Sequence, residues 1–289
     1  MPININININ INRIAIEVTR NCNLICKDFC MRGPSQKVNI SKEDVDLILN
    51  MINKENVTVN AIVFSGGEPT LNEDMIVYII DKIINDKIPV NSIEMVTNGH
   101  ILSPKIIDAF TKFNLYKKEE LKDEIEQMIK FAKEYSMESE IPYMTNFSLT
   151  AISRNKYHKP LTEEQISAYQ NACKNIFLDW KDSNNEDILK TGLAKTGKLY
   201  TYEVDPIKFL IKNNTINVYN AFYLTATGFL TTNGDGEYID MDINNLGHIK
   251  QTDLIDLINT EVENKINESR ENTDKPKTKK MFIKRLLRR

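Results

Sequence analysis

Three consecutive strand–loop–helix units between residues 13 and 112 constrain the fold of this chain more than any other feature. The predicted strands are short apolar runs at 13–18, 60–64 and 92–97, and a predicted helix follows each of them. Strands that alternate with helices favour a parallel sheet. The sequence therefore predicts an α/β fold, either a barrel or a doubly wound sheet, with functional groups at the carboxyl ends of the strands.

Composition narrows the class of protein. The 289 residues are 41% hydrophobic and carry a formal net charge of −3, which is typical of a globular protein and gives no global reason to expect nucleic acid as a partner. No apolar run has the length of a membrane span, and no secretory leader is recognisable. We therefore expect a cytoplasmic protein without a membrane partner. In a reducing compartment its four cysteines favour metal binding over disulfides.

Some segments have a weaker pattern. Residues 1–12 are a low-complexity run of alternating Ile and Asn, which predicts an edge strand or a frayed arm, and the first core strand is predicted to begin at Arg13. Residues 161–180 are predicted to be a helix. The Asn233-Gly234-Asp235-Gly236 stretch predicts a hairpin turn before a strand at 237–243.

Three cysteines crowd the loop after the first predicted strand: Cys22, Cys26 and Cys30. Three close thiols without a fourth nearby indicate a metal centre with one open position, either an iron–sulfur cluster or a zinc site completed by a distant histidine. Phe29, directly before the third cysteine, is placed to pack on a flat ligand. Cys173 has apolar helical neighbours and is interpreted as a buried, inert thiol.

Two further motifs follow the next two predicted strands. Gly66-Gly67-Glu68-Pro69 combines close backbone approach with one negative charge, and Thr97-Asn98-Gly99 offers small hydrogen-bonding side chains. Taken alone, each motif also fits an ordinary turn. Their occurrence in consecutive units, in this order, favours one shared site.

With these motifs the chain resembles the radical S-adenosylmethionine (radical SAM) superfamily. The resemblance implies a partial (βα)6 barrel of the TIM type, a [4Fe–4S] cluster on the three cysteines, and S-adenosylmethionine on the open iron. It implies reductive cleavage of S-adenosylmethionine and hydrogen abstraction from the substrate by the resulting 5′-deoxyadenosyl radical. An electron donor such as flavodoxin or ferredoxin is expected.

The resemblance also assigns residues. Cys22, Cys26 and Cys30 would bind the cluster, and Phe29 would lie against the adenine. The amino group of S-adenosylmethionine would be bound by the second motif, the ribose end would lie near the third, and a further polar contact would come from the strand after it. The cofactor-binding residues are thus Phe29, Gly66, Gly67, Glu68, Thr97, Asn98 and Ser148. No catalytic acid, base or radical-quenching residue can be assigned.

The C-terminal part resembles the SPASM or twitch-like extension of peptide-modifying relatives, so the substrate is expected to be a peptide or protein. This extension has no cysteines, and Thr225, Asp240 and Asp242 stand where relatives place cluster ligands. We therefore expect no auxiliary cluster. The implied division is an arm at 1–12, the barrel at 13–215, the extension at 216–270 and a basic tail at 271–289.

One departure from the family pattern leaves two alternatives open beside the radical SAM enzyme. Three residues separate Cys26 from Cys30, whereas the family pattern has two. The chain is then either an active radical SAM enzyme, a zinc-binding structural or interaction module, or a non-catalytic scaffold that keeps the barrel.

Overall fold

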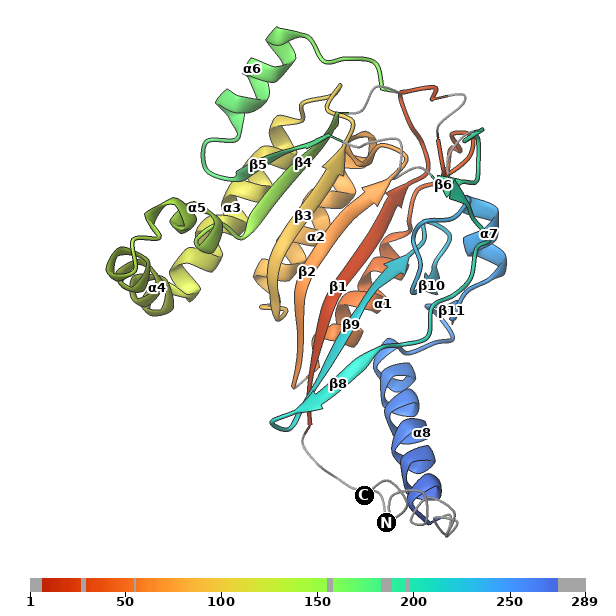
Figure 1. Cartoon of the computed structure of the whole chain (residues 1–289). Helices are drawn as coiled ribbons and strands as arrows, with labels where there is room; N and C mark the ends of the chain where they lie inside the picture. The colour runs from red at the N-terminus through yellow and green to blue at the C-terminus, as the bar shows by residue number, and fades with distance from the viewer. Residues whose placement is uncertain are drawn as a thin grey trace, which may run out of the picture. The chain divides into compact units, whose positions relative to one another are not determined.

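A mostly parallel sheet forms the centre of the protein, and its first strand lies between the second strand and a strand from late in the chain (Figure 1). The computed structural model describes residues 7–26, 30–54, 56–154, 158–182, 189–195 and 198–274. The order of strands in the main sheet is β11-β10-β9-β1-β2-β3-β4-β5, with β8 paired to β9. These strands are β1 (Asn8–Thr19), β2 (Val57–Gly66), β3 (Val90–Thr97), β4 (Ser148–Arg154), β5 (Phe177–Asp182), β8 (Phe209–Lys212), β9 (Thr215–Leu224), β10 (Phe229–Thr231) and β11 (Gly247–His248).

Helices cover one face of this sheet, as Figure 1 shows for α1, α2 and α3. Ser41 caps α1 by accepting a hydrogen bond from the Asp44 amide, and Ser103 caps α3 in the same way. Ile48 of α1 and Ile79 of α2 are completely buried, because apolar residues recur at helical spacing on the side that meets the sheet. The helices are α1 (Lys42–Ile52), α2 (Glu73–Asn85), α3 (Pro104–Glu120), α4 (Lys122–Glu134), α5 (Ile141–Met144), α6 (Glu163–Ala172), α7 (Tyr238–Ile243) and α8 (Leu254–Asp274).

The described part of the Ile-Asn arm is not an edge strand or a frayed tail. Strand β1 begins at Asn8 and pairs in parallel with β2 on one side and with β9 on the other. The apolar phase shift near Arg13 coincides with an irregularity in the β1–β9 register between Ile11 and Arg13. The extra residue of this bulge is in β9, because three positions separate Val218 from Ala221 whereas two separate Ile11 from Arg13. Strand β1 itself continues through this point, so the prediction of a strand start there was wrong.

Two other predicted elements differ in the structure. The predicted helix at 161–180 ends at Ala172, and Phe177–Asp182 forms β5, which pairs in parallel with β4. The predicted strand at 237–243 is the helix α7. The hairpin lies earlier, because β9 and β10 are joined by the turn that contains Gly228, with φ of +86°.

Strand β9 makes the start of the predicted extension part of the main sheet. Residues up to Thr252 form one compact unit. A second unit begins at Asp253, and its described part is α8, which starts at Leu254. The predicted boundary at 215 and 216 therefore falls at the first residues of a strand that pairs with β1.

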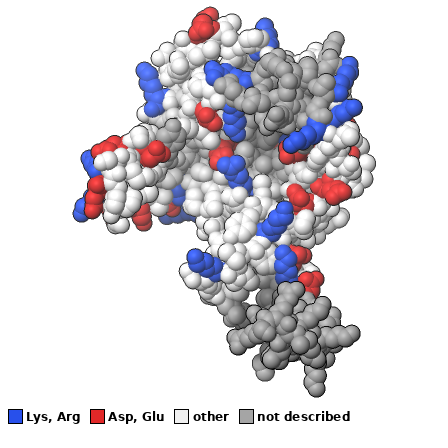
Figure 2. Space-filling view, viewed as in Figure 1, with Lys and Arg blue, Asp and Glu red and all other residues white. Residues whose placement is uncertain are grey.

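Charges of both signs are interspersed on one face of the molecule. On the face drawn in Figure 2, described Lys and Arg side chains lie among described Asp and Glu side chains without a broad area of one sign. An extended basic surface of the kind that binds nucleic acid is not seen among them on this face.

Candidate functional site

The loops that follow β1, β2 and β3 meet at the carboxyl edge of the parallel sheet, where the arrowheads in Figure 1 point. The loop after β1 carries the three predicted metal ligands. The Cys22 amide donates to Ser35 Oγ at 2.9 Å, and the Cys30 amide donates to the Cys26 carbonyl at 3.0 Å. Residues 27–29 lie outside the described residues, and the predicted adenine contact Phe29 is among them.

The three thiols are partly exposed and affect one another electrostatically. Burial raises the pKa of Cys26 to about 11, with further contributions from Cys30 and Cys22. Burial also raises the pKa of Cys22. Among the described residues, no three His, Cys, Asp or Glu side chains form a group that is already arranged around a metal ion. The donor set of three neighbouring thiols fits an iron–sulfur cluster chemically, and ligation would require loss of their protons.

The glycine pair brings the second motif against the base of the cysteine loop. The Gly67 amide donates to the Thr19 carbonyl at 2.9 Å, and the Glu68 amide donates to the Asn21 carbonyl at 2.8 Å. A Cβ at Gly67 would lie 2.5 Å from the Asn21 oxygen, so only glycine permits this approach. The amides of Gly67 and Glu68 are thus already hydrogen-bonded to backbone carbonyl groups of the protein.

Glu68 is completely buried, and its carboxylate joins two motifs. One oxygen accepts hydrogen bonds from Thr97 Oγ1 at 2.7 Å and from the amide and hydroxyl of Thr70 at 3.2 and 2.7 Å. The other accepts from the Asn98 amide at 2.8 Å. Such a carboxylate organises the loops around it, because every donor would otherwise be buried without a partner.

Asn98 connects the third motif to the first. Its side-chain nitrogen donates to Asn23 Oδ1 at 2.8 Å, and Asn23 lies directly after Cys22. Its side-chain oxygen accepts from the His100 amide at 3.0 Å. The structure thus brings together Glu68, Thr97, Asn98 and the start of the cysteine loop. Sequence reasoning missed Asn23, whose only signal is its place beside a candidate ligand.

Ser148 is not brought to this edge. It is buried at the amino end of β4 and donates to the Phe110 carbonyl at 2.7 Å. In the β3–β4 register Ser148 is level with Ile93, whereas Thr97 is level with Ile152. Four residues along a strand span about 13 Å, so the Ser148 side chain lies away from the other predicted contacts.

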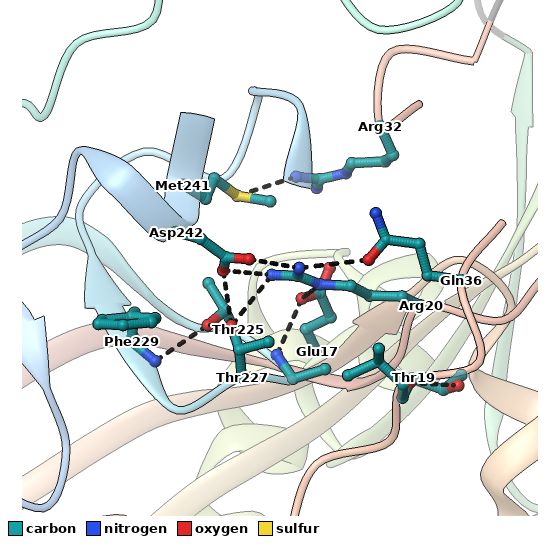
Figure 3. A network of polar contacts seen from close by, with 12 residues as sticks. Glu17, Thr19, Arg20, Arg32, Gln36, Thr225, Thr227, Phe229, Met241 and Asp242 are labelled. Carbon is teal, nitrogen blue, oxygen red and sulfur yellow. Dashed lines mark hydrogen bonds and ion pairs between the residues drawn. The ribbon is translucent and has the colours of Figure 1, made fainter. Parts of the chain in front are cut away.

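A second network fixes the base of the cysteine loop (Figure 3). Arg20 Nε donates to Glu17 Oε2 at 2.9 Å, and the two terminal nitrogens of Arg20 donate to the two carboxylate oxygens of Asp242, each at 2.6 Å. The side chains of Glu17 and Arg20 are 0% and 2% exposed. A bidentate pair between a guanidinium and a carboxylate is strong and directional. This pair links Arg20, two residues before Cys22, to helix α7.

The turn after β9 completes this network. The Ala226 amide donates to Glu17 Oε2 at 2.8 Å, and Thr227 Oγ1 donates to Asp242 Oδ1 at 2.6 Å. Thr225, one of the positions assigned to cluster ligands in relatives, has its hydroxyl 2.9 Å from that of Thr227. Polar side chains therefore fill this region. Sequence reasoning missed this network. Its signal was the charged residue Glu17 inside an apolar strand and the charged residue Arg20 directly after it.

The sequence around this site is similar to that of a known protein family. Residues 16–118 match the family model described as the Radical SAM superfamily. This stretch contains all three motifs. Over these residues the chain is similar to the radical SAM superfamily, whose enzymes use a [4Fe–4S] cluster and S-adenosylmethionine. No curated protein matched the chain.

Solved structures agree on the radical SAM fold. The structure of BtrN in complex with AdoMet and 2-DOIA is 12% identical and has a TM-score of 0.51, with 86% of this chain and 81% of that chain covered. Native anSMEcpe with bound AdoMet and Kp18Cys peptide is 11% identical and also has a TM-score of 0.51, with 86% and 80% covered. The predicted α/β class with a mostly parallel, partial-barrel sheet is confirmed. In the described residues, no helix has the length and apolarity to span a membrane.

Proposed function

We propose that the protein holds one [4Fe–4S] cluster through Cys22, Cys26 and Cys30, cleaves S-adenosylmethionine reductively and abstracts a hydrogen atom from its substrate. The observation that carries this proposal is the buried Glu68 carboxylate. It joins the glycine motif to Thr97 and Asn98, and Asn98 in turn joins the residue after Cys22. All three motif loops are thereby held at one edge of the sheet, as a single cofactor site requires.

Each motif would have a separate role in this site. The three thiolates would hold the cluster, and Phe29 would lie against the adenine. Gly66, Gly67 and Glu68 would frame the methionine end, while Thr97 and Asn98 would lie near the ribose. Because Glu68 and the two glycine-loop amides already have framework partners, we expect backbone carbonyl groups of this loop to contact the ligand. When bound, the cofactors supply a 5′-deoxyadenosyl radical.

The finer assignments rest on resemblance. A peptide or protein substrate is inferred from the likeness of the C-terminal segment to extensions of peptide-modifying relatives. A flavodoxin or ferredoxin would deliver the electron. We infer a cytoplasmic location, because a reducing compartment keeps cysteine ligands as thiols.

Anaerobic reconstitution with iron and sulfide tests the proposal. The expected result is about four iron and four sulfide per chain, an electron paramagnetic resonance signal that changes when S-adenosylmethionine is added, and formation of 5′-deoxyadenosine with dithionite. A variant with Cys22, Cys26 and Cys30 all changed to Ala should lose all three properties. Cys173→Ala is the matched control, since this buried cysteine belongs to no proposed site.

Three outcomes would contradict the proposal. Zinc without labile sulfide would indicate a structural metal module. A full cluster without 5′-deoxyadenosine would indicate a binding scaffold. Iron content that survives the triple cysteine change would remove the ligand assignment.

A further inference from the structure

Arg32, two residues after Cys30, has a guanidinium group with little to bind. Its carbon Cζ lies 5.1 Å from the centre of the Tyr223 ring, and Nη1 donates to the Met241 sulfur at 3.5 Å (Figure 3). A thioether is a weak acceptor, and a guanidinium has five N–H donors. In the part of the chain that the structure describes, no carboxylate forms an ion pair with Arg32. A half-buried cation in this state has donors to spare for a ligand.

A cavity of about 300 Å³ lies against this side chain. Its walls include Arg32, Asp205, Tyr223, Thr232, Asn233 and Asp235. This volume is at the lower end of the range for small-ligand pockets. Because Tyr223 and Arg32 are stacked at one wall, the cavity presents a fixed cation rather than a mobile surface side chain.

The opposite sign of charge stands at the same cavity. Asp205 and Asp235 both line it, and both residues are exposed. Among the described residues, neither carboxylate has an ion-pair partner. Other wall groups are already engaged, since Thr232 Oγ1 donates to the Asp205 carbonyl and Asn233 Oδ1 accepts from the Asp235 amide. The charged groups left to a ligand are therefore one guanidinium and two carboxylates.

A simple anion would meet repulsion from the aspartates, and a simple cation would meet repulsion from the arginine. A ligand with both charges satisfies both walls, and its carboxylate can bind the guanidinium in the bidentate geometry that arginine favours. We propose that this cavity binds the substrate through one acidic group, held by Arg32, and one basic group, held by Asp205 and Asp235. That the ligand is the substrate rests on the proposed function; the binding does not.

The backbone holds this anchor beside the thiol loop. The Leu193 amide donates to the Cys30 carbonyl at 2.7 Å, and the Tyr238 amide donates to the Arg32 carbonyl at 3.2 Å. Gly192 has φ of +61°, and a Cβ there would lie 2.5 Å from the Met31 oxygen. The segment from Cys30 to Arg32 is thus clamped on both sides, so a group bound at Arg32 stays close to the candidate cluster ligands.

Binding to the full-length protein without a cluster tests the inference independently of catalysis. The probes are the dipeptide Glu-Lys with acetylated and amidated ends, its singly charged relatives Gln-Lys and Glu-Gln with the same ends, and 4-aminobutanoate with the matched succinate and 1,4-diaminobutane. Calorimetry or ligand-observed NMR should show saturable binding of Glu-Lys, of 4-aminobutanoate, or of both, at least about tenfold tighter than the matched probes of one charge sign. Preference for the dipeptide would identify a peptide ligand, and preference for the free amino acid would identify a small molecule.

Variants then test which wall of the cavity binds which charged group of the ligand. Arg32→Gln should weaken binding of the doubly charged probe about tenfold or more, whereas Asp205→Asn should weaken it and strengthen binding of succinate. Lys112→Gln is the control, because Lys112 of α3 is paired with Asp81 of α2 and does not line the cavity. If Arg32→Gln does not fold, Ala221→Leu should fill the cavity, which Ala221 also lines, and should abolish binding in a folded protein. Failure of the unmodified protein to bind any doubly charged probe, or binding insensitive to these changes, would overturn the inference. Formation of 5′-deoxyadenosine in the same preparation after reconstitution would show that the proposed function stands regardless.

Discussion

Glu68 behaves as a buried acceptor for several donors, so loss of its charge should be felt throughout the site. Glu68→Gln would turn an NH2 group either toward the hydroxyls of Thr97 and Thr70 or toward the Asn98 amide, because these donors contact different carboxylate oxygens. We expect the free energy of unfolding to fall by about 2–3 kcal/mol and S-adenosylmethionine binding to weaken. Urea unfolding and equilibrium binding measure the two effects. Glu43→Gln, in an exposed ion pair with Lys250, is the control and should change stability by less than about 0.5 kcal/mol. A neutral result at Glu68 would refute its organising role.

Cys173 offers a pH-dependent test at the same scale. It is 6% exposed, and burial raises the pKa of its thiol to about 12 from an ordinary 9.0. The folded chain therefore keeps this proton between pH 9 and pH 12, while the unfolded chain loses it. Stability from this thiol is complete below about pH 9 and declines as the pH rises. Ellman titration of the cluster-free protein at pH 8 should show Cys173 as the slowest thiol, and a rapid reaction there would contradict its burial. In Cys173→Ala the alkaline loss of stability should be smaller.

The contact between the loops after β1 and β2 depends on glycine. A Cβ at Gly66 would lie 2.2 Å from the Thr19 oxygen, and φ at Gly66 is +151°. Gly66→Ala should destabilise the protein by roughly 2–4 kcal/mol and reduce cluster loading. Gly33→Ala separates strain from collision, because Gly33 also has positive φ, at +97°, but has open space around it. It should lose only about 1 kcal/mol. Equal losses in thermal or urea unfolding would show that close packing of the two loops is unimportant.

The sequence predicted those elements that are determined by residues close to one another in the chain. The three strand–loop–helix units, the Ser41 cap and the position of each motif after its strand follow from apolar spacing and turn residues within short windows. The pairing of β1 with β9 joins residues about 200 positions apart, and no local pattern encodes it. Helix α7 was missed because the glycines at 234 and 236 indicate a hairpin. The ion pair between Arg20 and Asp242 depends on both of these features, so the sequence could not predict it.

At the scale of the molecule, the Arg20–Asp242 pair joins the first strand to the C-terminal part of the main unit. Asp242→Asn should leave the buried guanidinium partly unpaired and lower the free energy of unfolding by about 1–3 kcal/mol, with Asp242 itself 22% exposed. Limited proteolysis should then cut the segment around α7 faster. Asp240→Asn is the control on the same helix, since the Asp240 carboxylate is outside this network. Identical unfolding curves for the two variants would show that the pair contributes little.

The pairing of β1 with β9 also has a consequence for biosynthesis. On the ribosome, the Ile-rich strand emerges before the other strands of its sheet, yet one of its two neighbours is translated only from residue 215 onward. Until then one edge of β1 has unsatisfied amide and carbonyl groups, and such edges invite pairing with other chains. Nascent chains halted before residue 215 should therefore need chaperone protection, and chains released beyond residue 224 should acquire native protease resistance in one late step.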